Sequence, residues 1–378
     1  MSVHTDRKKT LMTVTAASSS PTQARGSDES TPCLQAHGVW KVFGAKPQRA
    51  LDMADSGASR SEVLEATGNT IGVRDVSFAV ATGETFVVMG LSGSGKSTLL
   101  RCVAQLGGLS RGSVDLEGRE LTSMSASELR DVRRTKLSMV FQHFGLFPHR
   151  RVIDNVAYGL EVQGIKRAVR RERATAVLDL VGLSGWGEHY PGQLSGGMQQ
   201  RVGLARALAV EPTVLFFDEP FSALDPLIRR DMQDELLRLQ GEMNRTIVFV
   251  THDFDEAIKL GDRIAIMKDG EFDQIGTAEQ LIADPATDYV REFTKDVSRA
   301  KVLTVRSAMT PLAALTDVMA EAPTVMVDVR DSIETVLPTM LGSVAAVGVL
   351  DGSGDLIGVV DRDAVIRVIE TAGGSRAS

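Results

Sequence analysis

A glycine-rich octapeptide at residues 90–97, GLSGSGKS, constrains the fold of this chain more than any other feature. It follows an apolar run at residues 85–89, which we predict to be a strand, and it precedes a helix predicted for residues 97–106. Glycines let backbone N–H groups close around phosphate oxygens, and the following helix points its positive end at them. Lys96 then reaches the outer phosphates, and Ser97 holds Mg²⁺. The pattern therefore predicts nucleotide phosphate binding by a strand–loop–helix unit.

A second apolar run, at residues 214–217, ends in two carboxylates, Asp218 and Glu219. In a buried strand, Asp218 would emerge beside the phosphate loop, where it can bind Mg²⁺ through water. Glu219 would then be placed to polarise the attacking water. Apolar runs followed by Asp-Glu also occur at ordinary strand ends, so this pattern gains its weight from the other motifs.

The sequence LSGGMQQR at residues 194–201 opens a predicted helix. Ser195, Gly196 and Gly197 place free N–H groups and a hydroxyl at the helix N-terminus, and such an end attracts anions. Since the chain already has one phosphate loop, a second anion site suggests a second nucleotide-binding face. An ordinary Ser-Gly helix cap is the alternative that this motif leaves open.

Strand and helix patterns alternate around these motifs. We predict strands at residues 34–43, 76–80, 85–89, 137–141, 213–217 and 246–250, and helices at residues 47–68, 97–106, 154–163, 167–181, 196–209 and 226–242. Pro226 suits the first turn of the last helix, behind Asp225 as its cap. The alternation predicts an α/β domain with a mainly parallel sheet over residues 33–297, and the helical stretch at about 150–195 predicts an inserted helical subdomain.

The character of the chain changes near residue 300. Patterns at residues 324–329, 332–341, 345–350, 356–360 and 363–369 indicate strand, helix, strand, strand and helix, with a hairpin turn at residues 351–354. They predict a small α+β domain over residues 301–378. At the other end, residues 1–32 are rich in Ser, Thr and charge, and we expect a disordered tail there.

Composition limits the class of protein. The 378 residues carry a net charge of −7, which argues against general nucleic-acid binding. The two cysteines, Cys33 and Cys102, provide neither a disulfide framework nor a zinc site. No apolar run approaches the roughly 20 residues that a bilayer-spanning helix needs. We therefore expect a soluble protein whose link to any membrane runs through partners.

Further motifs occur in chain order with the first three. They are Phe43 in KVFG, Gln142 in VFQHFGLFPH, Asp225 in SALD, and His252 after the strand TIVFV. Together the motifs resemble the ATP-binding cassettes of ABC transporters over about residues 34–295. LSGGMQQR resembles the signature sequence, Gln142 the Q-loop, Asp225 the D-loop, His252 the switch histidine, and Phe43 the aromatic that stacks on adenine. The implied fold is a P-loop NTPase cassette with a RecA-like mixed sheet and an inserted helical subdomain.

The resemblance also implies how the site works. Two cassettes face each other head to tail as a homodimer, and each ATP, with Mg²⁺, lies between the phosphate loop of one and the signature of the other. The implied ATP-binding residues are Phe43, Gly90, Ser92, Gly93, Ser94, Gly95, Lys96, Ser97 and Thr98, with Ser97, Gln142 and Asp218 at the metal. Glu219 is implied as general base, His252 as the residue that holds the γ-phosphate and the water, and Gln142 as a sensor of Mg²⁺. Ser195, Gly196, Gly197 and Gln199 would serve the ATP of the opposite subunit.

Finer features resemble one group of importers. Met198 in the signature, the sequence FSALDPLIRRDMQDEL and the helix at 47–68 are similar to cassettes of glycine betaine/proline betaine importers. This resemblance implies integral-membrane permease partners, a separate substrate-binding protein, and a peripheral position on the cytoplasmic face of the inner membrane. Choline or amino-acid import, and less favourably a non-transport ABC ATPase, remain alternatives.

The C-terminal region resembles one CBS motif, at about 323–371, preceded by a remnant of another at about 302–322. Asp361 stands where relatives often place a Thr or Ser that contacts nucleotide, and its charge would repel phosphate. Sensing of ionic strength, binding of a cyclic dinucleotide and simple dimer contacts all stay open for this domain.

Overall fold

The computed structural model describes residues 32–142, 145–295, 297–312, 323–342 and 346–370. The disorder predicted for residues 1–32 falls almost entirely outside these ranges.

Six strands form a central sheet in the order β10-β9-β3-β8-β7-β6. They are β3 (Thr85–Met89), β6 (Leu137–Phe141), β7 (Val214–Asp218), β8 (Thr246–Thr251), β9 (Arg263–Lys268) and β10 (Glu271–Gly276). All neighbours pair in parallel except β9 and β10. Every residue of β3, β7 and β8 is buried, as expected for strands covered on both faces. The predicted mainly parallel sheet is confirmed, although β9 and β10 were not predicted.

The register of this sheet aligns the ends of its parallel strands. Met89 pairs with Thr251, and Asp218 pairs with both Val250 and Phe141. The carboxyl ends of parallel strands meet at one edge of a sheet, where α/β proteins bind ligands. The segments that leave the sheet at this edge include the phosphate loop, Gln142, Glu219 and His252.

A second, antiparallel sheet has the order β2-β1-β4-β5. Its strands are β1 (Leu34–Phe43), β2 (Thr70–Val80), β4 (Arg111–Leu116) and β5 (Arg119–Glu120). The insert between β1 and β2 is helical as predicted, but it forms two helices, α1 (Pro47–Asp55) and α2 (Arg60–Thr67). The break follows from Gly57, whose φ of 91° is left-handed, and from a capping box between Ser59 and Glu62 that starts α2.

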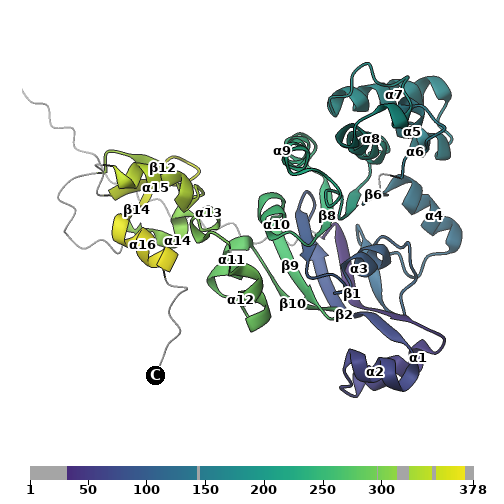
Figure 1. Ribbon diagram of the computed structural model, residues 1–378, viewed down its shortest axis with the longest axis horizontal. Helices are drawn as coiled ribbons and strands as arrows, with labels where there is room; N and C mark the ends of the chain where they lie inside the picture. The colour runs from purple at the N-terminus through teal and green to yellow at the C-terminus, as the bar shows by residue number, and fades with distance from the viewer. Residues whose placement is uncertain (1–31, 143–144, 296, 313–322, 343–345, 371–378) are drawn as a thin grey trace, which may run out of the picture. The chain divides into compact units, whose positions relative to one another are not determined.

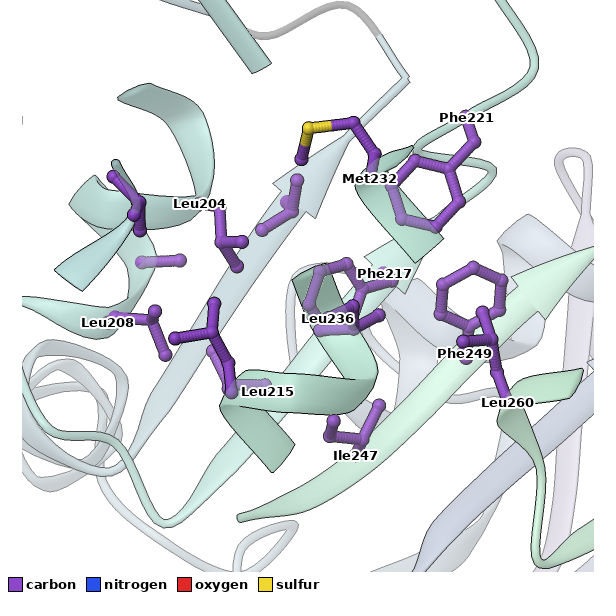
Figure 2. Close-up of a cluster of buried hydrophobic side chains, with 14 of the residues drawn as sticks. Leu204, Leu208, Leu215, Phe217, Phe221, Met232, Leu236, Ile247, Phe249 and Leu260 are labelled. Carbon is purple, nitrogen blue, oxygen red and sulfur yellow. The ribbon is translucent and has the colours of Figure 1, made fainter. Parts of the chain in front are cut away.

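Apolar clusters lie on both faces of the central sheet. On one face, α8 (Gly196–Leu208) and α9 (Pro226–Met243) pack over β7 and β8, with Leu204, Leu236 and Phe249 among the buried side chains (Figure 2). The other face is covered by α3 (Lys96–Val103). As predicted, Pro226 begins α9 and the carboxylate of Asp225 caps it. These two helix layers hold the strand ends in fixed positions.

Helices fill the segment between β6 and β7. They are α5 (Val152–Val156), α6 (Tyr158–Val162), α7 (Arg167–Leu180) and the 3₁₀ turn η1 (Pro191–Gln193), and α5 to α7 gather with α8 (Figure 1). The single helix predicted for 154–163 begins earlier and is divided at Ala157. The remaining helices among the described residues up to residue 297 are α4 (Ala126–Thr135), α10 (Phe254–Leu260), α11 (Ala278–Ala283) and α12 (Asp288–Thr294).

The C-terminal residues form a third sheet, β11-β14-β13-β12, with helices around it. The helices and strands of this region, in chain order, are α13 (Arg299–Val302), α14 (Val305–Ala308), β11 (Thr310–Pro311), β12 (Met326–Asp328), α15 (Ile333–Leu341), β13 (Ala346–Leu350), β14 (Leu356–Asp361) and α16 (Arg362–Glu370). The predicted succession of strand, helix, strand, strand and helix is confirmed, and so is the hairpin between β13 and β14. This region has its own apolar cluster, which includes Ile333, Val347 and Val360. Part of the predicted CBS remnant, residues 313–322, lies outside the described residues.

Candidate nucleotide-binding site

Two glycines fix the course of the phosphate loop. Gly90 has a φ of 154°, and a Cβ there would lie 2.2 Å from the carbonyl oxygen of Met267. Gly95 has a φ of 108°, and a Cβ there would lie 2.3 Å from the carbonyl oxygen of Gly72. Because backbone atoms occupy both places, only glycine fits without moving the chain.

Lys96 is almost fully buried, with 4% of its surface exposed. Its Nζ donates hydrogen bonds to the carbonyl oxygens of Gly90 (2.8 Å) and Leu91 (3.1 Å) and lies 3.7 Å from Oε1 of Glu219. Burial lowers the pKa of the ammonium, while the nearby carboxylates of Glu219 and Asp218 oppose that shift. The ammonium therefore lies at the loop, within reach of the triphosphate oxygens with which it would form charged hydrogen bonds.

Ser97 and Asp218 form the second part of the site. The Ser97 hydroxyl donates to Oδ1 of the buried Asp218 at 2.6 Å, and Arg101 lies 3.3 Å from the other carboxylate oxygen. A hydroxyl and a carboxylate are oxygen ligands of the kind that Mg²⁺ takes, with water and phosphate completing its shell. The described residues contain no cluster of three or more His, Cys, Asp or Glu able to hold a metal. Gln142 is exposed and directly follows Phe141, the register partner of Asp218, so it lies at the same edge.

Glu219 directly follows β7 and His252 directly follows the neighbouring strand β8, so the two side chains lie close together. Oε2 of Glu219 lies 3.1 Å from Nδ1 of His252. Glu219 has a φ of 47°, which costs a non-glycine residue about 1–2 kcal/mol. Its amide donates to the Val250 carbonyl at 3.0 Å, and its own carbonyl accepts from the Ser222 hydroxyl at 2.9 Å. Strain held by neighbouring hydrogen bonds is typical of functional positions, and a carboxylate next to an imidazole can take a proton from water.

A pocket of about 290 Å³ brings most of the predicted ATP residues together. It is lined by Phe43, Arg60, Thr70, Gly72, Ser92, Gly93, Gly95, Lys96, Ser97, Thr98 and Glu219. Phe43 ends β1 with half of its surface exposed, so its ring is available for stacking. Two predicted residues, Gly90 and Ser94, are not among the lining residues, and within the described part of the chain the hydroxyl of Ser94 is buried without a hydrogen-bond partner. The backbone conformation of Gly90, with its φ of 154°, contributes to the course of the loop.

Three lining residues were not predicted. Thr70 and Gly72 belong to β2, and Arg60 is the first residue of α2. Gly72 touches Phe43, because a Cβ at Gly72 would lie 2.8 Å from the ring. The pairing of β2 with β1, the strand that carries Phe43, brings Thr70 and Gly72 to the pocket, and the sequence alone gives no signal for it.

The signature residues lie apart from this pocket. Ser195 caps α8 by accepting from the amide of Met198 at 3.3 Å, and Gly197 packs so closely on Ile228 that a Cβ would lie 2.7 Å away. Asp225 accepts from the amide of Leu227 at 2.9 Å. None of the predicted signature and D-loop residues, Ser195, Gly196, Gly197, Gln199 and Asp225, lines the pocket. Their service to an opposite subunit stays a prediction.

Comparisons with known proteins agree with this geometry. The family described as ABC transporter matches residues 73–222. The glycine betaine transport ATP-binding protein OpuAA of Bacillus subtilis is 47% identical over 88% of this chain and 77% of its own length. The trimethylamine N-oxide transport ATP-binding protein TmoW of Ruegeria pomeroyi is 53% identical over 72% of this chain and 80% of its own. For ProV of Escherichia coli, a glycine betaine/proline betaine protein, the identity is 51% over 72% and 68%.

Solved structures show the same fold. The dimeric ATP-binding cassette MJ0796, bound to ADP and phosphate, has a TM-score of 0.55 to this chain at 31% sequence identity. The match covers 65% of this chain and 98% of that one.

Proposed function

Because the chain belongs to the ATP-binding subunits of ABC transporters, which are ATPases coupled to transport, we propose that it powers import of small methylated-amine osmolytes. The observation that carries this proposal is the identity of 47% to OpuAA over 88% of the chain. Glycine betaine and proline betaine are the first candidate substrates. Trimethylamine N-oxide is the second, because TmoW of Pelagibacter ubique is 44% identical over 98% of its own length.

We assign roles in hydrolysis from the contacts at the site. Lys96 and the amides of the phosphate loop bind the β- and γ-phosphates of ATP. Ser97 and Asp218 would hold Mg²⁺, with Gln142 beside them, and the ion would supply charge neutralisation at the phosphates. The oxygen of the water bonds to the γ-phosphorus while the bond between that phosphorus and ADP breaks. Glu219 accepts the proton that the water loses. His252, hydrogen bonded to Glu219, orients that carboxylate and would hold the γ-phosphate and the attacking water.

We propose that two copies of the chain form the active dimer, with the signature residues at the interface between them. Ser195, Gly196, Gly197 and Gln199 would contact the ATP of a second copy, with Asp225 at the same interface. Two observations support this arrangement: these residues lie outside the pocket of their own chain, and MJ0796 was solved as a dimer.

In the part of the chain that the structure describes, no helix has the length and apolar character needed to cross a membrane. On the likeness to the transport ATP-binding proteins OpuAA and ProV, we propose a peripheral position on the cytoplasmic face of the inner membrane, against permease subunits served by a substrate-binding protein.

The C-terminal domain is proposed as a CBS-like regulatory or dimerisation module, and residues 33–297 as the cassette. In this module Oδ1 of Asp361 accepts from the amide of Ala364 at 2.6 Å, at the start of α16. The carboxylate thus occupies the helix end that a phosphate would need. This contact argues against nucleotide binding at that helix.

Uptake in cells tests the function. Cells that carry this chain with its matching permease and binding protein would receive radiolabelled glycine betaine or trimethylamine N-oxide, and the same cells with Glu219→Gln serve as control. We expect uptake of one osmolyte that requires Glu219. Uptake that does not depend on Glu219, or uptake of choline or an amino acid alone, would contradict the osmolyte assignment.

A further inference from the structure

The helical insert brings a cation into the nucleotide pocket. Arg60 is half-buried at the start of α2, and its Nη1 donates to the carbonyl oxygen of Gly93 in the phosphate loop at 3.2 Å. The same side chain lines both the 290 Å³ pocket and a neighbouring groove of about 680 Å³. Arg60 therefore stands at the opening of the phosphate loop, on the side where Phe43 is exposed.

The guanidinium of Arg60 has donors to spare. It carries five N–H donors, and its hydrogen bond to Gly93 uses one of them. Across the described residues, no carboxylate forms an ion pair with Arg60. The nearest acid along the helix, Glu62, is engaged by the amide and the hydroxyl of Ser59 at 2.7 and 2.8 Å. An unpaired, partly desolvated guanidinium is suited to phosphate, which it binds through two parallel hydrogen bonds.

A second arginine of the same groove shows the contrast. Nε of Arg74 lies 2.9 Å from Glu271, and its two other nitrogens donate to the carbonyl oxygens of Ala54 and Ala58. Arg74 thus braces the insert against the sheet, whereas Arg60 keeps its charge unneutralised at the pocket. The two arginines line the same groove, but Arg74 is paired with a carboxylate and Arg60 is bound only to a backbone carbonyl among the described residues.

Packing fixes the insert in place. Ala50, Leu51 and Val63 are buried in an apolar cluster with Trp40 and Ile71 of the antiparallel sheet. Val63 lies three residues after Arg60, one helical turn away. The position of the guanidinium relative to the loop is therefore set by a packed core rather than by a free surface helix.

From these contacts we infer that Arg60 is a nucleotide-binding residue, whose guanidinium pairs with the phosphates of bound ATP and ADP. The inference rests on the proposed nucleotide site and adds to it a charge from the insert. It also gives the insert a role, because the insert is what carries this charge to the phosphate loop. The competing explanation is that Arg60 only braces Gly93 through its hydrogen bond.

Calorimetric titration of the purified full chain with MgADP and with ATPγS separates these explanations. Arg60→Ala removes both charge and hydrogen bond, Arg60→Lys keeps the charge, and Arg60→Gln keeps a donor without charge. Arg49→Ala, an exposed arginine on α1, is the matched control. We expect Arg60→Ala and Arg60→Gln to weaken both nucleotides about tenfold at low salt, as for loss of a charged hydrogen bond. Arg60→Lys should stay within about threefold, and the differences should shrink at high salt.

Two results would overturn the inference: wild-type affinity in Arg60→Gln with a loss in Arg60→Lys, or an Arg60→Ala that binds as Arg49→Ala does. Lys96→Ala separates failure of the inference from failure of the site. If Lys96→Ala abolishes binding while Arg60→Ala does not change it, only the inference fails. If neither variant matters, the nucleotide site itself is wrong.

Discussion

Replacing Gly95 with alanine tests whether the phosphate loop has the geometry described. The added Cβ would lie 2.3 Å from the Gly72 carbonyl oxygen and 3.1 Å from Cε of Met267. The methionine methyl can move, but the carbonyl belongs to β2 and cannot move alone. A left-handed backbone costs an alanine about 1–2 kcal/mol, and forcing an atom into a packed site costs about 1–3 kcal/mol more. We therefore expect the free energy of unfolding to fall by about 2–5 kcal/mol if the loop keeps its conformation. If the loop shifts to relieve the clash, its amides no longer surround the phosphates and ATPase activity is lost.

Gly57→Ala is the matched control for this substitution. Gly57 has a φ of 91°, but nothing lies within 4 Å of an added Cβ, so only the backbone term remains. Urea unfolding should show a loss of about 1–2 kcal/mol for Gly57→Ala, with MgADP binding unchanged. A displacement of about 1 Å at the reacting groups is enough to cost about a hundredfold in rate, so Gly95→Ala should lose most ATPase activity. Equal stability and equal activity in the two variants would refute the reasoning.

Three further substitutions test other parts of the structure. Leu236→Ala should cost about 2–5 kcal/mol in urea unfolding, because Leu236 is buried between α9 and β7 (Figure 2), and a loss below about 1 kcal/mol would contradict that packing. Asp218→Asn should leave MgADP binding weak and insensitive to Mg²⁺ concentration, whereas Mg²⁺ dependence equal to that of the wild type would place the ion elsewhere. Burial raises the pKa of Glu256, which is hydrogen bonded to Gln233. The folded state therefore holds its proton to higher pH than the unfolded state, and stability falls as pH rises from the ordinary carboxyl pKa of 4.5 to that raised value. Glu256→Gln should accordingly be more stable than the wild type at pH 8, with the difference vanishing near pH 4, and a constant difference across that range would contradict a buried carboxyl.

The site was predictable to the extent that parallel strands dictate it. Apolar runs that end in GLSGSGKS, Asp218-Glu219 and Thr251-His252 become neighbours as soon as their strands lie parallel in one sheet. The motifs therefore lie at the carboxyl ends of the strands, which is where α/β proteins bind ligands. The two glycine contacts and the bond between Ser97 and Asp218 add the atomic detail.

Other features depend on contacts that a single sequence does not display. The strand β4 begins with exposed residues and has a weak apolar alternation, and its pairing with β1 joins segments far apart in the chain. Arg60 enters the pocket only because the insert packs on β1 and β2. By contrast, the break in the insert had a local signal in Ser59 and Glu62, and so did the start of α4 in Ser125 and Glu128.

The central claim is that this chain hydrolyses ATP with Glu219 as base in order to drive transport. The most direct measurement is ATP hydrolysis by the chain assembled with its permease in proteoliposomes, with binding protein and glycine betaine or trimethylamine N-oxide, compared with Glu219→Gln. The account predicts hydrolysis that one osmolyte stimulates and that falls by about 10²- to 10⁴-fold in the variant, while MgADP binds as before. Hydrolysis at the wild-type rate in Glu219→Gln, or hydrolysis that no osmolyte changes, would contradict it.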